Sequence, residues 1–227
     1  FIDTHMHEMT YSKDSFLALD QMVQIARMKG LEGICITDHD SMGLKEYAAE
    51  YSKDTGFPIF VGIEYYSLQG DIVAFGIEDY PTERIPAQDF IDLVNAQAGV
   101  CFAAHPFRNN NRGLEENLRK VKGLHGLEVL NGSTSVEACQ KAARYAAELG
   151  LFTLGSSDCH VPEKVGVCAT YFPEKFHTME GFLDAFRKGQ MKPAYYAGGK
   201  YHVLELKEQQ KSKIPFTFYA FNDRMYL

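Results

Sequence analysis

Phe1-Ile2-Asp3-Thr4-His5-Met6-His7 constrains the fold more than any other stretch of the sequence, because a short apolar run ends there in two histidines. Side chains at alternate positions of a β-strand share a face, so His5 and His7 can reach the same ion. Later apolar runs repeat this plan and have the length of buried strands. They cover residues 31–37, 58–63, 100–104, 126–130 and 152–155.

Segments with helical periodicity lie between most of these runs. In residues 17–30, apolar side chains recur at three- and four-residue spacing, and Gly30 is a suitable C-cap. Further helices are expected at residues 45–53, 87–97, 136–149 and 179–188, and an extra strand at 71–77. Apolar strands joined by helices predict an α/β protein with a parallel sheet, either doubly wound or closed into a barrel. Periodicity alone leaves both open.

Potential metal ligands follow the ends of five of these runs. Parallel strands finish on one edge of a sheet, where such folds bind ligands, so these side chains should converge. Burying so many polar groups without partners would be costly, and a metal centre would satisfy them together. Imidazole and carboxylate ligands without cysteine suit Zn, Mn or Fe. The candidates are His5, His7, Asp38, His39, Asp40, Glu64, His105, Asp158 and His160.

Composition limits the class of protein. The 227 residues, 45% of them hydrophobic, fit one large domain or one domain with a small appendage. A net charge of -7 argues against binding of extended nucleic acid. No apolar run reaches the ~20 residues of a membrane helix. Five cysteines without a CxxC pair indicate a reducing cytoplasm. Strand-like stretches at 201–206 and 214–221 predict a small β appendage or a contribution to a partner subunit, which leaves a homo-oligomer open.

Taken together, these motifs resemble those of the PHP (polymerase and histidinol phosphatase) family. The resemblance extends in order and spacing over residues 1–197. It implies a distorted seven-stranded α/β barrel in residues 1–198, with residues 199–227 as a tail packed on the barrel or on a partner subunit. The matching motifs are Asp3-x-His5-x-His7, Thr37-Asp38-His39, Gly62-Ile63-Glu64, His105-Pro106 and Gly155-Ser156-Ser157-Asp158-x-His160.

The same resemblance implies two or three divalent ions. His5, His7, Glu64 and Asp158 would hold the first ion, and Glu64 with His105 the second. His39 and His160 would hold a third ion, with Asp14 as a further candidate. Two departures from the family pattern concern its carboxylates. The segment that carries Asp14 is one residue longer than in many relatives, and Asp71 stands where many relatives have a histidine ligand.

The expected activity is hydrolysis of a phosphate monoester of a small metabolite or nucleotide by metal-activated water. Arg108 could fork onto the phosphate, whereas Asp38 and Asp40 flank a ligand and could orient it or move a proton. Two other readings remain. One is a metal-dependent amidohydrolase, and the other is a non-catalytic metal-binding regulatory domain.

Overall fold

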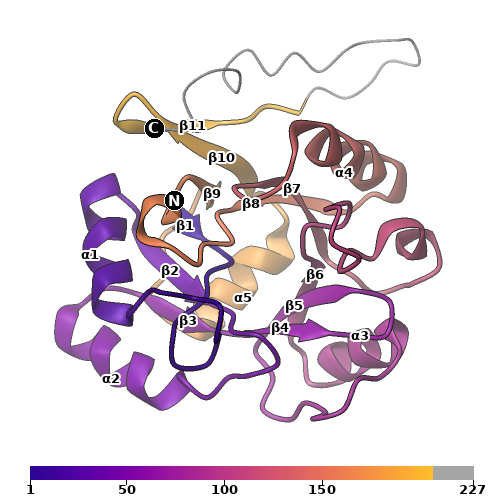
Figure 1. The fold of residues 1–227 in the computed structure, drawn as a ribbon, viewed down its shortest axis with the longest axis horizontal. Helices are drawn as coiled ribbons and strands as arrows, with labels where there is room; N and C mark the ends of the chain where they lie inside the picture. The colour runs from indigo at the N-terminus through magenta and orange to yellow at the C-terminus, as the bar shows by residue number, and fades with distance from the viewer. Residues whose placement is uncertain (207–227) are drawn as a thin grey trace.

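The computed structural model describes residues 1–206, which form two mixed β-sheets with helices on their outer faces (Figure 1). The six-stranded sheet has the order β11 (Lys200–Val203), β10 (Lys192–Ala197), β9 (Cys168–Tyr171), β1 (Ile2–Asp3), β2 (Gly33–Ile36), β3 (Ile59–Val61). The five-stranded sheet has the order β4 (Ile63–Tyr66), β5 (Asp71–Phe75), β6 (Val100–Ala103), β7 (Gly126–Asn131), β8 (Phe152–Ser156). Neighbours are parallel within β1–β2–β3 and within β6–β7–β8.

The expected closed barrel is not formed in residues 1–206, because the two sheets do not join in one ladder. Two isolated parallel bridges connect them instead, His39 with Glu64 and Met6 with Cys159. Gly62 marks the switch between sheets: β3 before it pairs with β2, and β4 after it pairs with β5. A Cβ at Gly62 would lie 2.4 Å from the carbonyl oxygen of Ala74, so only glycine allows this close approach.

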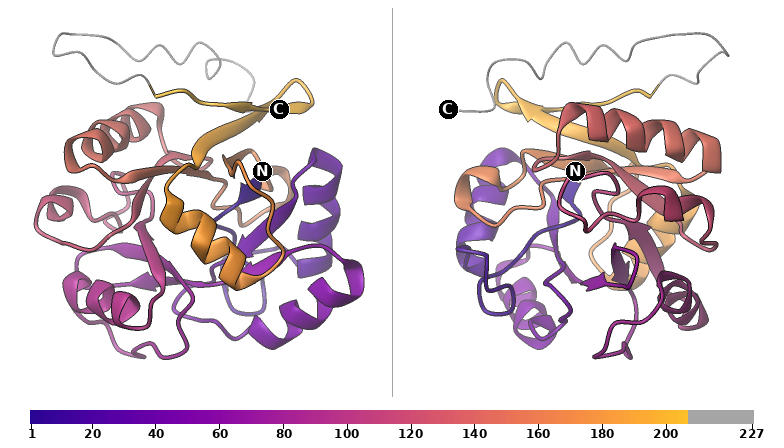
Figure 2. Two further views of the ribbon diagram at one scale, coloured as in Figure 1. Left: turned by 180° about the vertical axis from the view of Figure 1, so that it is seen from behind. Right: turned by 45° about the vertical axis from the view of Figure 1, so that its right-hand side comes forward.

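Inward-facing aromatic side chains fill the space between the sheets. Phe182 of α5 (Met179–Lys188) lies with its ring centroid 5.0 Å from that of Phe60 in β3 and 5.0 Å from that of Phe75 in β5. Viewed from behind, α5 covers one end of the two sheets (Figure 2). This packing leaves the ligand-bearing strand ends at the other end of the same interior.

The remaining helices cover the outer faces, and their ends follow from capping. The first two are α1 (Leu19–Lys29) and α2 (Lys45–Thr55), and the next two are α3 (Ala87–Ala96) and α4 (Val136–Leu149). The side chain of Ser135 caps α4, and Gly150 ends it in the left-handed conformation with a φ of 66°. Gly30 ends α1 in the same way with a φ of 81°, as its sequence predicts.

The chain beyond α5 adds an edge to the six-stranded sheet. Strands β9 and β10, which sequence periodicity misses, pair antiparallel, and β11 then pairs with β10. The predicted domain boundary at residues 198/199 falls in the β10–β11 turn, and the predicted strand at 214–221 lies outside the described residues. Phe1 stacks on Tyr201 of β11 with a centroid distance of 4.9 Å, which fastens this hairpin to the start of the chain.

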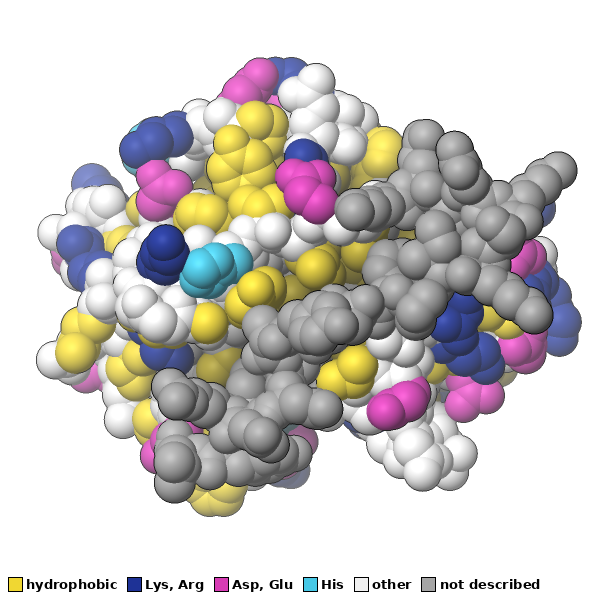
Figure 3. Space-filling view, turned by 90° about the horizontal axis from the view of Figure 1, so that it is seen from above, with side chains coloured by type: hydrophobic (Ala, Val, Ile, Leu, Met, Phe, Trp, Pro, Cys, Tyr) yellow, Lys and Arg dark blue, Asp and Glu magenta, His cyan; other side chains and the backbone are white. Residues whose placement is uncertain are grey.

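The face over β10 and β11 carries hydrophobic side chains interspersed with acidic and basic ones (Figure 3). Within residues 1–206, no helix combines the length and the apolar character that crossing a bilayer requires.

Candidate metal centre

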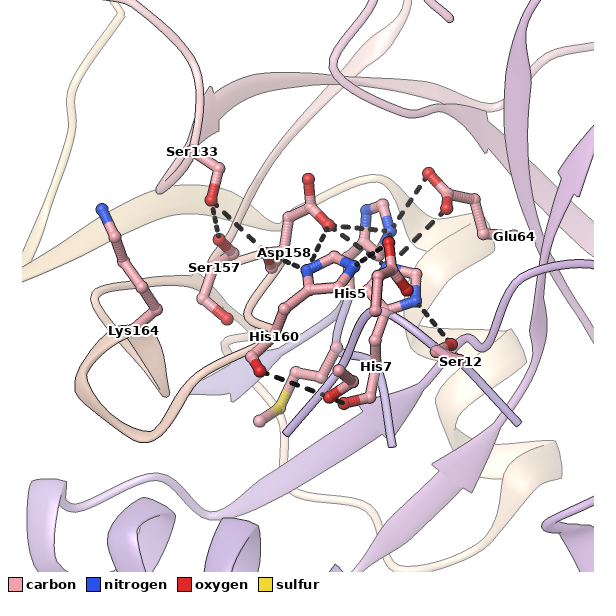
Figure 4. A network of polar contacts seen from close by, with 12 residues as sticks. His5, His7, Ser12, Glu64, Ser133, Ser157, Asp158, His160 and Lys164 are labelled. Atoms are coloured by element: carbon pink, nitrogen blue, oxygen red, sulfur yellow. Dashed lines mark hydrogen bonds and ion pairs between the residues drawn. The ribbon is translucent and has the colours of Figure 1, made fainter. Parts of the chain in front are cut away.

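The ends of five strands bring their predicted ligands into one cluster (Figure 4). Nε2 of His5 lies 3.0 Å from Nε2 of His7, and Nε2 of His7 lies 3.2 Å from Oδ1 of Asp158. His5, His7 and Asp158 are at most 2% exposed. The chain separation between the first and last of these residues shows that the fold, and not local sequence, assembles the cluster.

Glu64 lies at the middle of the cluster. Its Oε1 is 2.9 Å from Nε2 of His105 and 3.3 Å from Nε2 of His5. Its Oε2 is 2.6 Å from Nδ1 of His39, yet neither of these two buried atoms has a partner with hydrogen-bond geometry. A buried carboxylate oxygen and an imidazole nitrogen that face each other without a hydrogen bond are positioned as ligands to a shared cation.

The solvent-facing side of the cluster is formed by His39, His160 and Asp14. The two imidazole side chains are each 25% exposed, and Asp14 is 62% exposed. Oδ2 of Asp14 lies 3.2 Å from Nε2 of His39 and 3.4 Å from Nε2 of His160. The longer segment that carries Asp14 therefore still delivers this carboxylate to the predicted ligands.

The donor set fits divalent ions. In each of four overlapping groups, three ligand atoms lie within 4.8 Å of one another. Ligand bonds to such ions are ~2.0–2.2 Å, so two atoms on one ion are separated by up to ~4 Å, close to the separations seen here. The groups are His7/His39/His160, His5/His7/Glu64, His5/His105/Asp158 and Glu64/Asp71/His105. The arrangement supports more than one ion, with shared ligands between them.

The charges of the cluster also call for bound cations. Burial alone would raise the pKa of Asp158, but His5 and Arg108 hold it well below its usual range. Burial would likewise lower the pKa of His5, whereas Glu128, Asp158 and Glu64 raise it well above its usual value. A divalent ion would supply the positive charge that these carboxylates otherwise draw from a protonated imidazole.

Glu128 supports His5 from behind. Oε1 of Glu128 lies 2.8 Å from Nδ1 of His5, which assigns the proton to Nδ1 and directs Nε2 of His5 toward the cluster. Oε2 of Glu128 accepts hydrogen bonds from the backbone N–H of His105 (2.6 Å) and from the amide of Asn131 (2.9 Å). Glu128 therefore positions two predicted ligands at once.

Ser12 has the same role behind His7. Its hydroxyl lies 3.1 Å from Nδ1 of His7 and donates to Oδ1 of Asp38 at 2.7 Å. Burial lowers the pKa of His7 to about 3, so the ring is neutral at neutral pH. Because the Ser12 hydroxyl donates to Asp38, it accepts from Nδ1 of His7, which leaves Nε2 of His7 without a proton. Sequence reasoning missed Ser12, because a serine in a polar loop resembles any turn residue.

The structure places the two predicted catalytic aspartates away from the centre of the cluster. Asp38 accepts hydrogen bonds from Ser12 and from the backbone N–H of Glu8, and thus positions His7 indirectly. Asp40 is exposed, and its Oδ1 accepts a hydrogen bond from the backbone N–H of Tyr66 at 2.8 Å. These hydrogen bonds join Asp38 and Asp40 to the chain segments around the cluster.

Two arginines contact carboxylates of the cluster. Arg108 forms an ion pair with Asp158 and donates to Oδ1 of Asn131 at 2.8 Å. Arg112 forms two hydrogen bonds with Asp71, of 2.7 and 2.8 Å. Burial, together with Glu64, raises the pKa of Asp71 to about 7. Both arginines therefore contribute positive charge within the cluster itself.

The backbone is strained at the ends of the ligand-bearing strands. Asp40, His105 and Asp158 have φ angles of 49°, 26° and 50°, values that residues other than glycine rarely adopt. Each such residue costs on the order of 1–3 kcal/mol and persists only where the surrounding structure enforces it. Three such residues beside one cluster indicate a functional site.

The sequence profile of the PHP-associated family matches residues 136–191. An uncharacterized protein of Methanocaldococcus jannaschii is 24% identical over 110 residues, which are 48% of this chain and 64% of that protein. The match thus spans less than two thirds of the relative.

Solved structures show the same fold. A proposed metal-dependent phosphoesterase from Bifidobacterium adolescentis superposes with a TM-score of 0.60 and 20% identity, over 71% of this chain and 88% of that one. An amidohydrolase from Chromobacterium violaceum, solved with bound sulfate and no metal, gives a TM-score of 0.63 and 20% identity, over 82% of this chain and 96% of that one. At these identities the likeness concerns the fold.

The predicted resemblance to the PHP family is therefore confirmed. The fold is shared with these solved structures, and the strand ends carry groups of side chains that could hold metal ions.

Proposed function

We propose that this chain hydrolyses phosphate monoesters of a small metabolite or nucleotide at the cluster around Glu64. The observation that carries the proposal is a set of mostly buried imidazoles and carboxylates, in overlapping groups that share residues, beside Arg108. Divalent ions bound there would activate a water molecule and neutralise the phosphoryl oxygens.

The protein's own residues prepare this chemistry in three ways. Glu128 and Ser12 fix the rotation of His5 and His7, so their Nε2 atoms face the ions. The floor of the site is buried, which strengthens electrostatic interactions and excludes bulk water. The more exposed His39, His160 and Asp14 mark the side from which a substrate approaches.

Arg108 favours a phosphate ester over an amide. Its Nη2 contacts Asp158 and Asn131, and its Nε donates to Thr134 at 3.1 Å. Within residues 1–206, Nη1 makes no hydrogen bond, so it remains available to a phosphoryl oxygen. The amidohydrolase relative itself binds sulfate, a tetrahedral anion like phosphate, and the net charge of -7 favours a small substrate over extended nucleic acid.

A paired activity screen tests the proposal. Purified protein is stripped of metal, reloaded separately with Mn²⁺, Zn²⁺ or Fe²⁺, and assayed against a set of small phosphate monoesters and a set of amides. We expect phosphate release with at least one metal, no release by the stripped protein, and no amide cleavage. Amide cleavage without phosphate release would support an amidohydrolase, and inactivity on both sets despite bound metal would support a regulatory domain.

A further inference from the structure

Arg112 contacts a group of three side chains that together could ligate one metal ion. Glu64, Asp71 and His105 bring three ligand atoms within 4.8 Å of one another, and all three side chains are at most 3% exposed. Nε and Nη2 of Arg112 each donate to a different oxygen of Asp71, and Nη2 also lies 4.0 Å from Oε2 of Glu64. Both oxygens of Asp71 are therefore engaged by a cation that belongs to the chain.

Both the backbone and the side chain of Arg112 hold it against Asp71. The backbone N–H of Asp71 donates to the carbonyl oxygen of Arg112 at 2.7 Å. The side chains bond the other way round, because the guanidinium of Arg112 donates to the carboxylate of Asp71. The guanidinium also lies 4.2 Å from the ring centroid of Tyr66. At Gly70, an added Cβ would lie 2.6 Å from the backbone of Gly113, which shows how tightly the two segments pack. Arg112 is thus held in place from three sides.

A guanidinium in this position changes the charge that the cluster can accept. It remains protonated at any pH a protein tolerates, and it repels a divalent ion placed between Glu64, Asp71 and His105. That ion would also have to displace Arg112 from Asp71, because both carboxylate oxygens are already engaged. The other three groups of ligand atoms do not include Asp71. Asp158, which belongs to one of them, pairs with Arg108 through Oδ2 and still turns Oδ1 toward His5 and His7.

We propose that Arg112 replaces one divalent ion, so that the Glu64/Asp71/His105 group stays free of metal and the centre holds one ion fewer than its ligands could bind. This inference rests on the proposed function, since it presupposes a metal centre at the same cluster. Asp71 is then the anchor of a built-in cation and not a ligand.

Metal counting in two pairs of variants tests the inference. Arg112→Gln and Arg112→Met remove the charge, while Arg112→Lys keeps it. Arg84→Gln is the matched control, because Arg84 stacks on the same Tyr66 ring at 3.2 Å but, among residues 1–206, forms no ion pair or hydrogen bond with Asp71. Each protein is saturated with Mn²⁺, dialysed and analysed by inductively coupled plasma mass spectrometry, with circular dichroism and thermal melting to verify folding.

We expect Arg112→Gln or Arg112→Met to bind one more Mn²⁺ per chain than the wild type, and Arg112→Lys and Arg84→Gln to bind the wild-type number. An unchanged number in the folded neutral variants would overturn the inference while leaving the metal centre in place. A gain in Arg112→Lys equal to that in Arg112→Met would overturn the charge argument. Absence of bound Mn²⁺ in the wild type would instead refute the metal centre, and the inference with it.

Discussion

Replacing Glu64 with glutamine is expected to lower kcat for phosphate ester hydrolysis by at least ~1,000-fold, a loss of about 4 kcal/mol in transition-state stabilisation. Glu64 contacts His5, His39 and His105 through its two oxygens, so it is the residue best placed to bridge ions. Glutamine keeps the shape of the side chain but removes its charge and one acceptor. Steady-state kinetics with saturating metal measure the effect.

The matched control is Glu78→Gln, which removes an exposed carboxylate paired with Lys45 on the surface. This variant should retain the wild-type rate, because surface ion pairs contribute little. Thermal melting of both variants separates a catalytic defect from unfolding. A Glu64→Gln protein that is folded and turns over within threefold of the wild type would show that Glu64 does not bridge the ions.

Metal removal is the second change with a large expected effect. Without ions, the buried carboxylates Glu64, Glu128 and Asp158 all pair with one imidazole, His5, with Arg108 as a further cation at Asp158. An ion present at 100 times its Kd stabilises the folded state by about 2.7 kcal/mol, and two ions by about 5 kcal/mol. For a chain of this size, the loss of two ions corresponds to a fall in Tm of roughly 10–20 °C on chelation.

Differential scanning calorimetry with and without a chelator measures this shift. Readdition of Mn²⁺ or Zn²⁺ should restore the original Tm, which distinguishes loss of the ion from irreversible damage. The shift should also depend on metal concentration, as expected for a ligand that binds only the folded chain. A Tm that is the same with chelator and with added metal would indicate that no stabilising ion binds at the cluster.

Most helices and strands could be predicted from the sequence, because their signals are local. The bounds of α4 and α5 match those expected from periodicity, and Gly150 and Gly189 cap them as glycines usually do. The barrel was predicted incorrectly because closure depends on which strands pair. Gly62 lies where one continuous extended segment passes from one sheet to the other, and its close approach to Ala74 of the next strand exists only in the folded chain.

The convergence of the ligands was predictable for a different reason. Parallel strands end at the same edge, so a ligand at each strand end was sufficient to place His5, Glu64 and His160 near one another. The roles of the supporting residues were harder to predict. Ser12 bonds to an imidazole five positions earlier in the chain and Glu128 to one 123 positions away, and strand periodicity does not predict which side chains form these hydrogen bonds.

Residues whose function depends on competition between partners were the least predictable. Arg108 was expected to bind phosphate, but the fold also gives it Asp158 and Asn131 as partners. Asp71 was expected as a substitute ligand. In the fold, Arg112, 41 positions later in the chain, donates hydrogen bonds to both of its carboxylate oxygens. In both pairs the charge balance of the assembled cluster determines the contact, and that balance exists only after folding.

The most direct test of the metal centre is an anomalous difference map from crystals of the protein grown with Mn²⁺. The geometry predicts at least one strong peak at ~2.0–2.2 Å from Nε2 of His7 or from a carboxylate oxygen of Glu64. Further peaks should lie beside His39 and His160. A well-ordered site with no anomalous peak within bonding distance of these side chains would contradict the account.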